Sequence, residues 1–216
     1  MKPITALFSG CSWTYGDELE EEKRLYQRFQ NHIPGINPIN NSKRGASNDW
    51  IFRNTIPYFN SGIKVFFVQW TMPSRTEYRI TGSSKYMDVT IQNTNPKKYY
   101  EYYTGEIGED NLLKNHYCMQ ELCKLYDILY LPLLIGFKPS IANSSSPWLK
   151  LCDNLPYDIR MSVGDEICAN KHPNPTGHKL IAEDIYKYYY TKLKNLEILF
   201  LIYLILENNL QIAPKP

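Results

Sequence analysis

Two short polar stretches, far apart in the chain, carry the residue types that acyl transfer needs. The first holds Ser12, which follows an apolar run at 4–8 and lies between Gly10 and Gly16. The second holds His172, in a polar segment just before the last helical pattern. A serine hydroxyl becomes an effective nucleophile when a histidine takes its proton. A lone serine after a strand can equally be a turn residue or a helix N-cap, so His172 is what favours chemistry at Ser12.

The elements around these residues predict an open, mainly parallel sheet. Residues 4–8 and 63–70 are short apolar runs rich in β-formers, and the second is apolar enough for a strand buried on both faces. Residues 17–32 and 47–59 have the charged and apolar faces of amphipathic helices. We therefore predict an α/β fold, a three-layer α/β/α sandwich with a flavodoxin-like central sheet. In such folds the chemistry lies at the carboxyl edge of the sheet, where we expect Ser12 and His172 to meet.

Four segments, taken in order, resemble the sequence blocks of the SGNH (GDSL-like) hydrolases. They are 10–16, 44–49, 68–71 and 172–178, and the resemblance extends over residues 4–190. In that family the first block carries the nucleophile and the second carries a glycine whose N–H binds the oxyanion. The last block carries the general base. The resemblance therefore implies these roles for Ser12, Gly45 and His172.

The third block departs from the family pattern. It usually holds an asparagine that completes the oxyanion hole, whereas this chain has Gln-Trp-Thr at 69–71. Asn48 and Thr71 are the two residues that could take its place, and the sequence does not choose between them. The expected oxyanion donors are therefore the N–H groups of Ser12 and Gly45, with Asn48 or Thr71 beside them.

The last block lacks the acidic residue that usually orients the histidine. That residue normally stands three positions before the base, sometimes nearer, and this chain has Ala-Asn at 169–170. The candidates for orienting His172 are Asn170 and Asp165, and a backbone carbonyl is a further alternative. His178 lies six residues beyond His172, so we expect it to be structural, with the role of base as its alternative.

Two functions follow from these residues. The first is a serine hydrolase that cleaves a carboxylic ester, such as an O-acyl group on a carbohydrate, with Ser12 as nucleophile and His172 as base. The alternative is a catalytically impaired relative that binds a glycan or a protein partner. The incomplete third and last blocks favour the alternative, and the retained pair of Ser12 and His172 favours the hydrolase.

Composition excludes other classes of function. The 216 residues carry a net charge of +2 without a clustered basic stripe, so we expect no nucleic-acid partner. No set of His, Asp and Glu has metal-ligand spacing, so we expect neither a metal nor a cofactor. The five cysteines contain no CxxC, which is typical of packed, reduced thiols.

The first residues and the composition bear on where the protein is located. The first residues lack the apolar stretch of a signal peptide, so we expect a cytoplasmic protein. Abundant Tyr, Asn, Lys and Ile indicate an A/T-rich genome, and a viral protein in the host cytoplasm fits this composition.

One hydrolase domain is expected over residues 1–195, with an insertion at 72–103 that lies over the site. An apolar tail follows at 196–216. Its nine consecutive apolar residues, 198–206, are too few to span a bilayer. We expect the tail to pack on its own domain; the alternatives are a homo-oligomer contact through 196–207 and contact with a membrane surface.

Overall fold

A parallel sheet forms the centre of the molecule. The computed structural model describes residues 4–33, 35–79, 82, 86–89, 105–136, 145–168 and 171–195. The five strands of the sheet are arranged in the order β2-β1-β3-β6-β7. They are β1 (Ile4–Gly10), β2 (Ile36–Ser42), β3 (Val65–Trp70), β6 (Leu129–Leu134) and β7 (Tyr157–Asp158). Every neighbouring pair is parallel, so all carboxyl ends lie at one edge.

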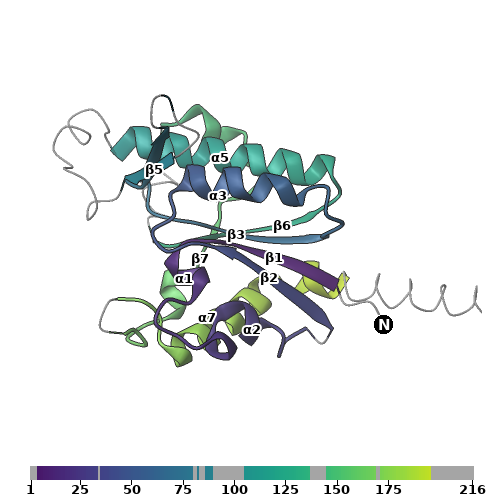
Figure 1. Ribbon diagram of the computed structural model, residues 1–216. Helices are drawn as coiled ribbons and strands as arrows, with labels where there is room; N and C mark the ends of the chain where they lie inside the picture. Colours follow the sequence, from purple (N-terminus) through teal and green to yellow (C-terminus); the bar gives the residue numbers. More distant parts are fainter. Residues whose placement is uncertain are drawn as a thin grey trace, which may run out of the picture.

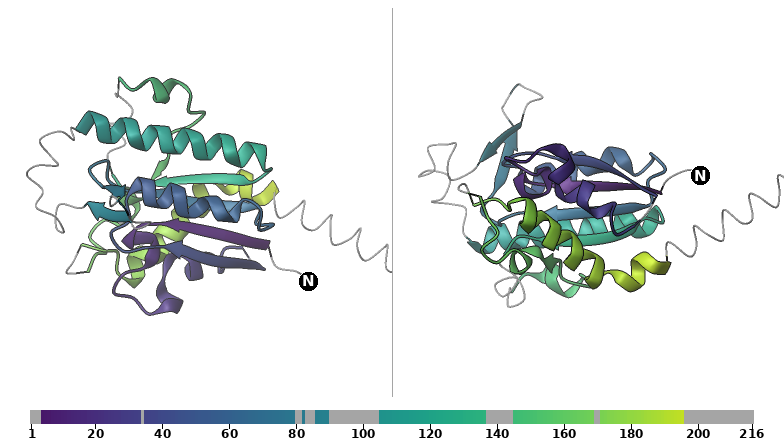
Figure 2. Two further views of the ribbon diagram at one scale, coloured as in Figure 1. Left: turned by 45° about the horizontal axis from the view of Figure 1, so that its top comes forward. Right: turned by 90° about the horizontal axis from the view of Figure 1, so that it is seen from below.

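Helices cover both faces of this sheet, which makes the three layers. Helices α3 (Asn48–Thr55) and α5 (Gly105–Leu125) lie on one face, as Figure 1 shows. Helices α1 (Ser12–Tyr15), α2 (Leu25–Phe29) and α7 (Pro175–Tyr188) lie on the other. Short 3₁₀ turns complete the order: η1 (Glu21–Lys23), η2 (Ile56–Tyr58), η3 (Pro147–Lys150) and η4 (Ile159–Ser162). In the right-hand view of Figure 2, which is from below, α7 lies in front of the strands. The predicted three-layer, mainly parallel fold is confirmed.

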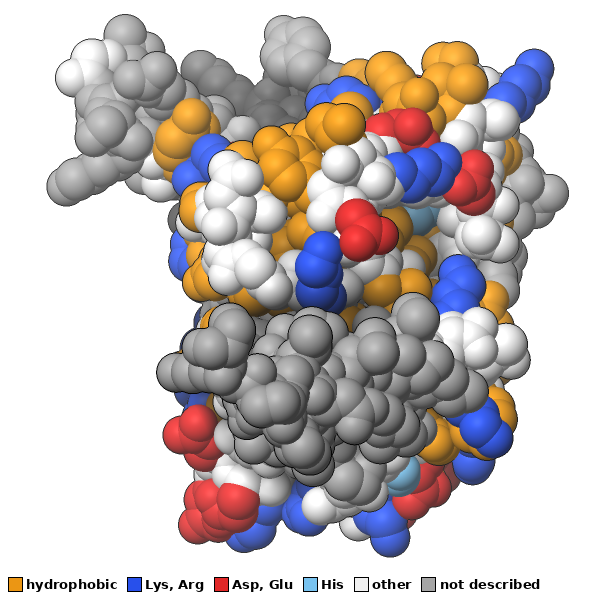
Figure 3. Space-filling view, turned by 90° about the vertical axis from the view of Figure 1, so that its right-hand side faces the viewer, with side chains coloured by type: hydrophobic (Ala, Val, Ile, Leu, Met, Phe, Trp, Pro, Cys, Tyr) orange, Lys and Arg blue, Asp and Glu red, His pale blue; other side chains and the backbone are white. Residues whose placement is uncertain are grey.

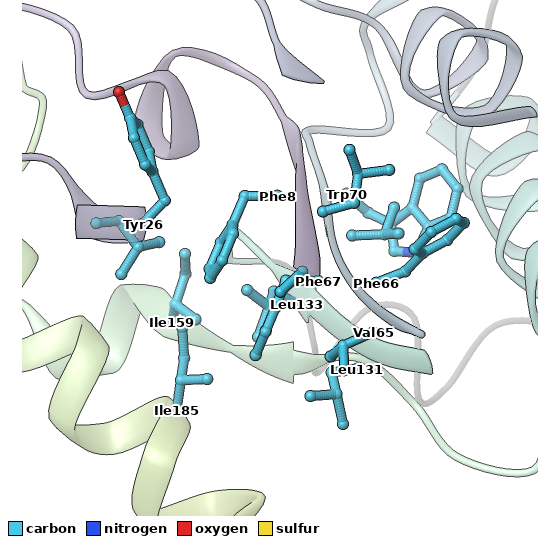
Figure 4. Close-up of a cluster of buried hydrophobic side chains, with 14 of the residues drawn as sticks. Phe8, Tyr26, Val65, Phe66, Phe67, Trp70, Leu131, Leu133, Ile159 and Ile185 are labelled. Atoms are coloured by element: carbon cyan, nitrogen blue, oxygen red, sulfur yellow. The ribbon is translucent and has the colours of Figure 1, made fainter. Parts of the chain in front are cut away.

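The core lies on both sides of the two central strands, β1 and β3. The rings of Phe8 and Phe67 stack with centroids 4.4 Å apart, and both side chains are fully buried. Figure 4 shows them beside Ile185 of α7, while Trp70 lies on the opposite side of the sheet. Burial on both faces explains why β3 is a continuous apolar run.

The predicted helix over 17–32 is wrong as a single element. The chain forms α1, the 3₁₀ turn η1 and then α2 instead. Two residues break the helix: Glu18 has left-handed backbone with φ of 69°, and Arg24, between η1 and α2, has extended backbone with ψ of 156°. A helix cannot continue through either conformation. The helix predicted at 47–59 is present as α3, and the side chain of Ser47 caps it by accepting from the Trp50 N–H.

The insertion after β3 begins with an antiparallel hairpin of β4 (Thr76–Arg79) and β5 (Tyr86–Val89). The described part of this insertion is attached to α3. Arg53 forms a bidentate ion pair with Glu77, with N–O distances of 2.8 to 3.1 Å, and its guanidinium lies 3.9 Å from the centroid of the Tyr86 ring. Residues 90–104 and the tail at 196–216, including the oligomer contact expected there, lie outside the described residues.

Replacing Arg53 by methionine is expected to loosen this hairpin. The Glu77 side chain is only 4% exposed, so replacing Arg53 removes a bidentate ion pair from a buried carboxylate. Because Arg53 is itself partly exposed, we expect a loss of about 2 kcal/mol in the free energy of unfolding. Thermal denaturation would show a decrease of about 6 °C. The double variant with Glu77→Gln should recover part of this loss, and equal stability of the wild type and Arg53→Met would contradict the prediction.

The amino ends of the strands form the opposite end of the molecule. Figure 3 shows hydrophobic, basic and acidic side chains interspersed there. Two exposed ion pairs, Lys64–Asp127 at 3.2 Å and Lys124–Asp153 at 2.9 Å, lie close to this end. A cavity of 420 Å³ lies between α5, β6 and the end of α7, and neither Ser12 nor His172 lines it. Among the described helices, none combines the length and apolarity needed to cross a membrane.

Candidate active site

Ser12 lies at the carboxyl edge of the sheet, directly after β1. It is the first residue of α1 and is only 5% exposed. Gly16 ends this four-residue helix in the left-handed conformation. Since β1 lies between β2 and β3, the loops that follow those strands flank Ser12 on both sides.

His172 lies in a tight loop that leads into α7. Its carbonyl accepts a hydrogen bond from the Cys168 N–H at 2.6 Å, and an isolated β-bridge joins Ile167 to Pro173. Asn174 then caps α7, because its Oδ1 accepts from the Gly177 N–H at 2.9 Å. The Asn174 amide also donates to the Glu166 carboxylate at 2.8 Å. Backbone pairing and the cap together fix the position of the imidazole.

The two residues meet although 160 positions separate them. The Nε2 atom of His172 lies 3.0 Å from the Ser12 Oγ, which is hydrogen-bond distance. The expected proximity of Ser12 and His172 is therefore observed. For the serine hydroxyl to donate to Nε2, a neutral ring must carry its proton on Nδ1.

The other side of the imidazole has no hydrogen-bonding partner in the described residues. The Nδ1 atom of His172 is buried and makes no hydrogen bond within that part of the chain. Asp165, one of the candidates for orienting His172, is exposed and makes no hydrogen bond to Nδ1. The loop places this carboxylate at the surface. The backbone carbonyl of Asp165 accepts a hydrogen bond from the Ile167 N–H. Asn170, the other candidate, lies outside the described residues.

His178 is buried inside α7, and its ring makes no hydrogen bond to Ser12. The pKa of this histidine is lowered to about 4, mainly by burial and to a smaller extent by the nearby His172 and two arginines. Neither ring nitrogen has a hydrogen-bond partner among the described residues. A histidine that is buried and makes no hydrogen bond to the serine is not placed to act as its base.

His116 belongs to a buried hydrogen-bond chain on the other side of the sheet. Trp70 Nε1 donates to the Tyr130 hydroxyl at 2.9 Å, and this hydroxyl lies 2.8 Å from His116 Nδ1. His116 Nε2 lies 2.8 Å from the carbonyl of Asn154. Burial lowers the pKa of His116 to about 4, so the ring is neutral near pH 7. Its polar atoms are satisfied, and it has no contact with Ser12.

The turn after β2 brings Gly45 to the same edge as Ser12. Ser42 is in register with Gly10, and the Lys43 N–H donates to the Gly10 carbonyl at 3.1 Å. Gly45 has a φ of 70°, a conformation that glycine adopts without strain. Ser12 is the first residue of its helix, so its N–H has no intrahelical acceptor.

Asn48 and Thr71 connect the two loops that flank Ser12. The Thr71 N–H donates to Asn48 Oδ1 at 2.8 Å, and Asn48 Nδ2 donates back to the Thr71 carbonyl at 3.2 Å. One amide hydrogen of Asn48 remains after this exchange. The Thr71 hydroxyl is buried and has no partner within the described residues. Both residues proposed for the missing asparagine therefore keep a donor.

Gln69 is the residue at this edge whose role the sequence did not reveal. It is fully buried, and its side chain bonds to the turn that carries Ser12. The available signal was a long polar side chain inside an otherwise apolar strand, since a buried amide must find partners.

The parts of the chain that the structure describes contain no set of side chains that could bind a metal ion. No three His, Cys, Asp or Glu side chains cluster there in a way that could hold an ion. Burial raises the pKa of Cys123 to about 12, so this thiol stays protonated near neutral pH.

Solved structures with the same fold are esterases and lipases, at low sequence identity. The psychrotrophic esterase EstA from Pseudoalteromonas is 12% identical with a TM-score of 0.55, and the match covers 88% of this chain and 99% of that one. A lipolytic G-D-S-L protein from Veillonella parvula is 12% identical with a TM-score of 0.51, and the match covers 87% and 98%. An acetyl xylan esterase, AlAXEase, is 14% identical with a TM-score of 0.52, over 86% and 99%.

No protein-family model and no curated protein sequence matches this chain. The structural matches nevertheless extend over most of it, and the neighbours are G-D-S-L lipolytic proteins and esterases. The resemblance inferred from the sequence blocks is thereby supported at the level of the fold.

Proposed function

We propose that this protein is a serine hydrolase that cleaves carboxylic esters, with Ser12 as nucleophile and His172 as general base. The observation that carries the proposal is the 3.0 Å contact between Ser12 Oγ and His172 Nε2 at the carboxyl edge of the sheet. A nucleophile within hydrogen-bond reach of a base is the arrangement that activates a serine. The esterases and lipases among the structural neighbours support the same class of reaction.

The reaction proceeds in two halves. Ser12 Oγ attacks the ester carbonyl while His172 Nε2 takes the hydroxyl proton, which gives a tetrahedral intermediate and an imidazolium ring. That proton then passes to the leaving alcohol, and the acyl group remains on Ser12. A water molecule, deprotonated by the same nitrogen, attacks the acyl group and releases the carboxylic acid. Ser12 recovers its proton from His172.

The oxyanion of each intermediate needs hydrogen-bond donors at the same edge. The N–H groups of Ser12 and Gly45 are the backbone donors of this proposal. Asn48 contributes the amide hydrogen that its exchange with Thr71 leaves over, and the Thr71 hydroxyl is the alternative third donor. Losing one such donor typically costs about 10²–10³ in rate.

Because Nδ1 of His172 has no hydrogen-bonding partner in the described part of the chain, we expect the enzyme to be slow. When the ring is protonated, Nδ1–H carries positive charge in a buried position that has no acceptor among the described residues. In triads with a carboxylate, that group holds the tautomer and stabilises the imidazolium. We therefore propose slow turnover for this chain relative to hydrolases with a full triad.

The proposed substrate is an O-acyl ester of a carbohydrate. An acetyl xylan esterase among the structural neighbours supports this class. Short-chain aryl esters are suitable probes because they need no sugar subsite.

A fluorophosphonate probe tests the central step directly, because it bonds covalently only to an activated serine. We expect the wild-type protein to be labelled and Ser12→Ala to remain unlabelled. Ser42→Ala is the matched control: this serine ends β2 at the same edge, and its hydroxyl is bonded to the Phe8 carbonyl. Mass spectrometry should locate the adduct on Ser12. A wild-type protein that resists the probe would overturn the proposal.

A glycan-binding or protein-binding function is the second candidate. The observation that favours it is that the buried Nδ1 of His172 has no hydrogen-bonding partner among the residues that the structure describes, since an inactive relative needs no orienting carboxylate. This candidate predicts that acetylated oligosaccharides bind with equal affinity to the wild type and to His172→Ala, without hydrolysis by either. Hydrolysis by the wild type would exclude it.

A further inference from the structure

We infer that Gln69 is a positioning residue, which holds the turn around Ser12 in the geometry that the reaction needs. Its importance for catalysis rests on the proposed function, whereas its structural role can be tested without it. The residue occupies the segment of the chain where an oxyanion-binding asparagine was expected. Here the side-chain amide of Gln69 forms hydrogen bonds with the turn after β1 instead.

The Gln69 carbonyl is the acceptor for three donors from that turn. Oε1 lies 3.2 Å from the Cys11 N–H nitrogen, 3.3 Å from the Cys11 thiol sulfur and 3.0 Å from the Thr14 hydroxyl. The amide nitrogen donates to the Trp70 carbonyl at 2.6 Å. All of these contacts are buried, so water does not compete for them.

These contacts bracket the nucleophile. Cys11 precedes Ser12, and Thr14 follows it within the same short helix. Fixing both positions fixes the direction of the Ser12 hydroxyl and of its backbone N–H. The turn needs this support from β3, because α1 has only four residues and no side-chain cap at its amino end.

Gly10 makes the approach of Gln69 possible. A Cβ atom at position 10 would lie 2.6 Å from the Thr14 hydroxyl oxygen and 3.0 Å from the Gln69 Cβ. The first distance is shorter than real Cβ contacts, and the second is tighter than nearly all of them. Glycine at position 10 therefore leaves the space in which the Thr14 hydroxyl and the Gln69 side chain form their hydrogen bond.

The test compares labelling rates rather than total labelling. We expect Gln69→Leu to be labelled by the fluorophosphonate about 10²-fold more slowly, because a displacement of about 1 Å can cost that much. Its KM for an aryl ester should change little while kcat falls. Thr14→Val, which removes one of the donors, should slow labelling less, and Thr14→Ser should restore it because the hydroxyl returns.

Thr55→Val is the matched control. The Thr55 hydroxyl is also buried and also bonds to β1, at 2.8 Å from Ser9 Oγ, but away from the nucleophile turn. Its loss should lower thermal stability without slowing the labelling reaction. Labelling of Gln69→Leu at the wild-type rate, well below its melting temperature, would overturn the inference.

A crystal structure of Gln69→Leu keeps the inference testable if the wild type is not labelled at all. In that case the proposed function fails, but Gln69 still has a structural consequence. We expect Ser12 Oγ to move away from His172 Nε2 by about 1 Å or more in the variant. A Ser12–His172 contact unchanged from 3.0 Å would show that Gln69 does not position the turn.

Discussion

Replacing Ser12 or His172 by alanine is expected to abolish the hydrolysis of short-chain aryl esters, with a loss of about 10³-fold or more in kcat. The reason is that the two side chains form one functional unit at a distance of 3.0 Å. Without His172 the serine hydroxyl keeps its proton, and without Ser12 no acyl-enzyme forms. Initial rates with p-nitrophenyl acetate, measured on variants whose folding is verified by circular dichroism, provide the test.

The double variant distinguishes a unit from two separate contributions. Because either single change already removes the nucleophilic route, the variant lacking both side chains should be little worse than either alone. His32→Gln is the control for changing a histidine, since His32 stacks on Tyr186 and not on the site. Substantial activity in either single variant would refute the assignment of the pair.

Acid is expected to destabilise the fold well before the carboxylates titrate. Burial lowers the pKa of His116 and of His178 to about 4, from the 6.5 of an exposed histidine. The unfolded chain therefore binds protons at a pH where the folded chain does not. Stability is fully present above about pH 6.5 and is lost progressively as the pH falls toward 4.

At pH 5 each of these histidines is expected to have cost about 2 kcal/mol of the free energy of unfolding, and together about 4 kcal/mol. Urea denaturation at pH 7.5 and pH 5.0 measures the difference. His178→Leu removes one of the two histidines that titrate, so it should remove about half of the pH dependence. Neither nitrogen of this ring has a hydrogen bond among the described residues, so the substitution breaks none there.

Tyr189→Phe is the control for this experiment. It deletes the buried hydrogen bond from the Tyr189 hydroxyl to the Pro132 carbonyl, 2.6 Å long, and introduces no group that titrates between these pH values. Stability should fall equally at both pH values. A wild-type protein equally stable at pH 7.5 and pH 5.0 would contradict the assignment of two buried neutral histidines.

The sequence by itself determined the sheet and its chemical edge. The apolar runs at 4–8 and 63–70 predicted strands, the second buried on both faces, and polar residues follow directly after them. Parallel strands place such residues at one edge, which is why the meeting of Ser12 and His172 was predictable from two distant segments. The break in the helix predicted over 17–32 could not be predicted, because a charge pattern does not reveal the left-handed backbone at Glu18.

The tertiary structure alone decided how the polar groups at that edge are used. The expected orienting role of Asp165 depended on the path of a loop, and this path leaves the carboxylate at the surface. Gln69 appeared to be only a departure from a family block, yet packing of β3 beside β1 places its amide within reach of Cys11 and Thr14. Hydrogen bonds between residues more than fifty positions apart depend on distances of a few tenths of an ångström. Residue type and spacing along the chain do not specify these distances, because they are set by how the strands and helices pack.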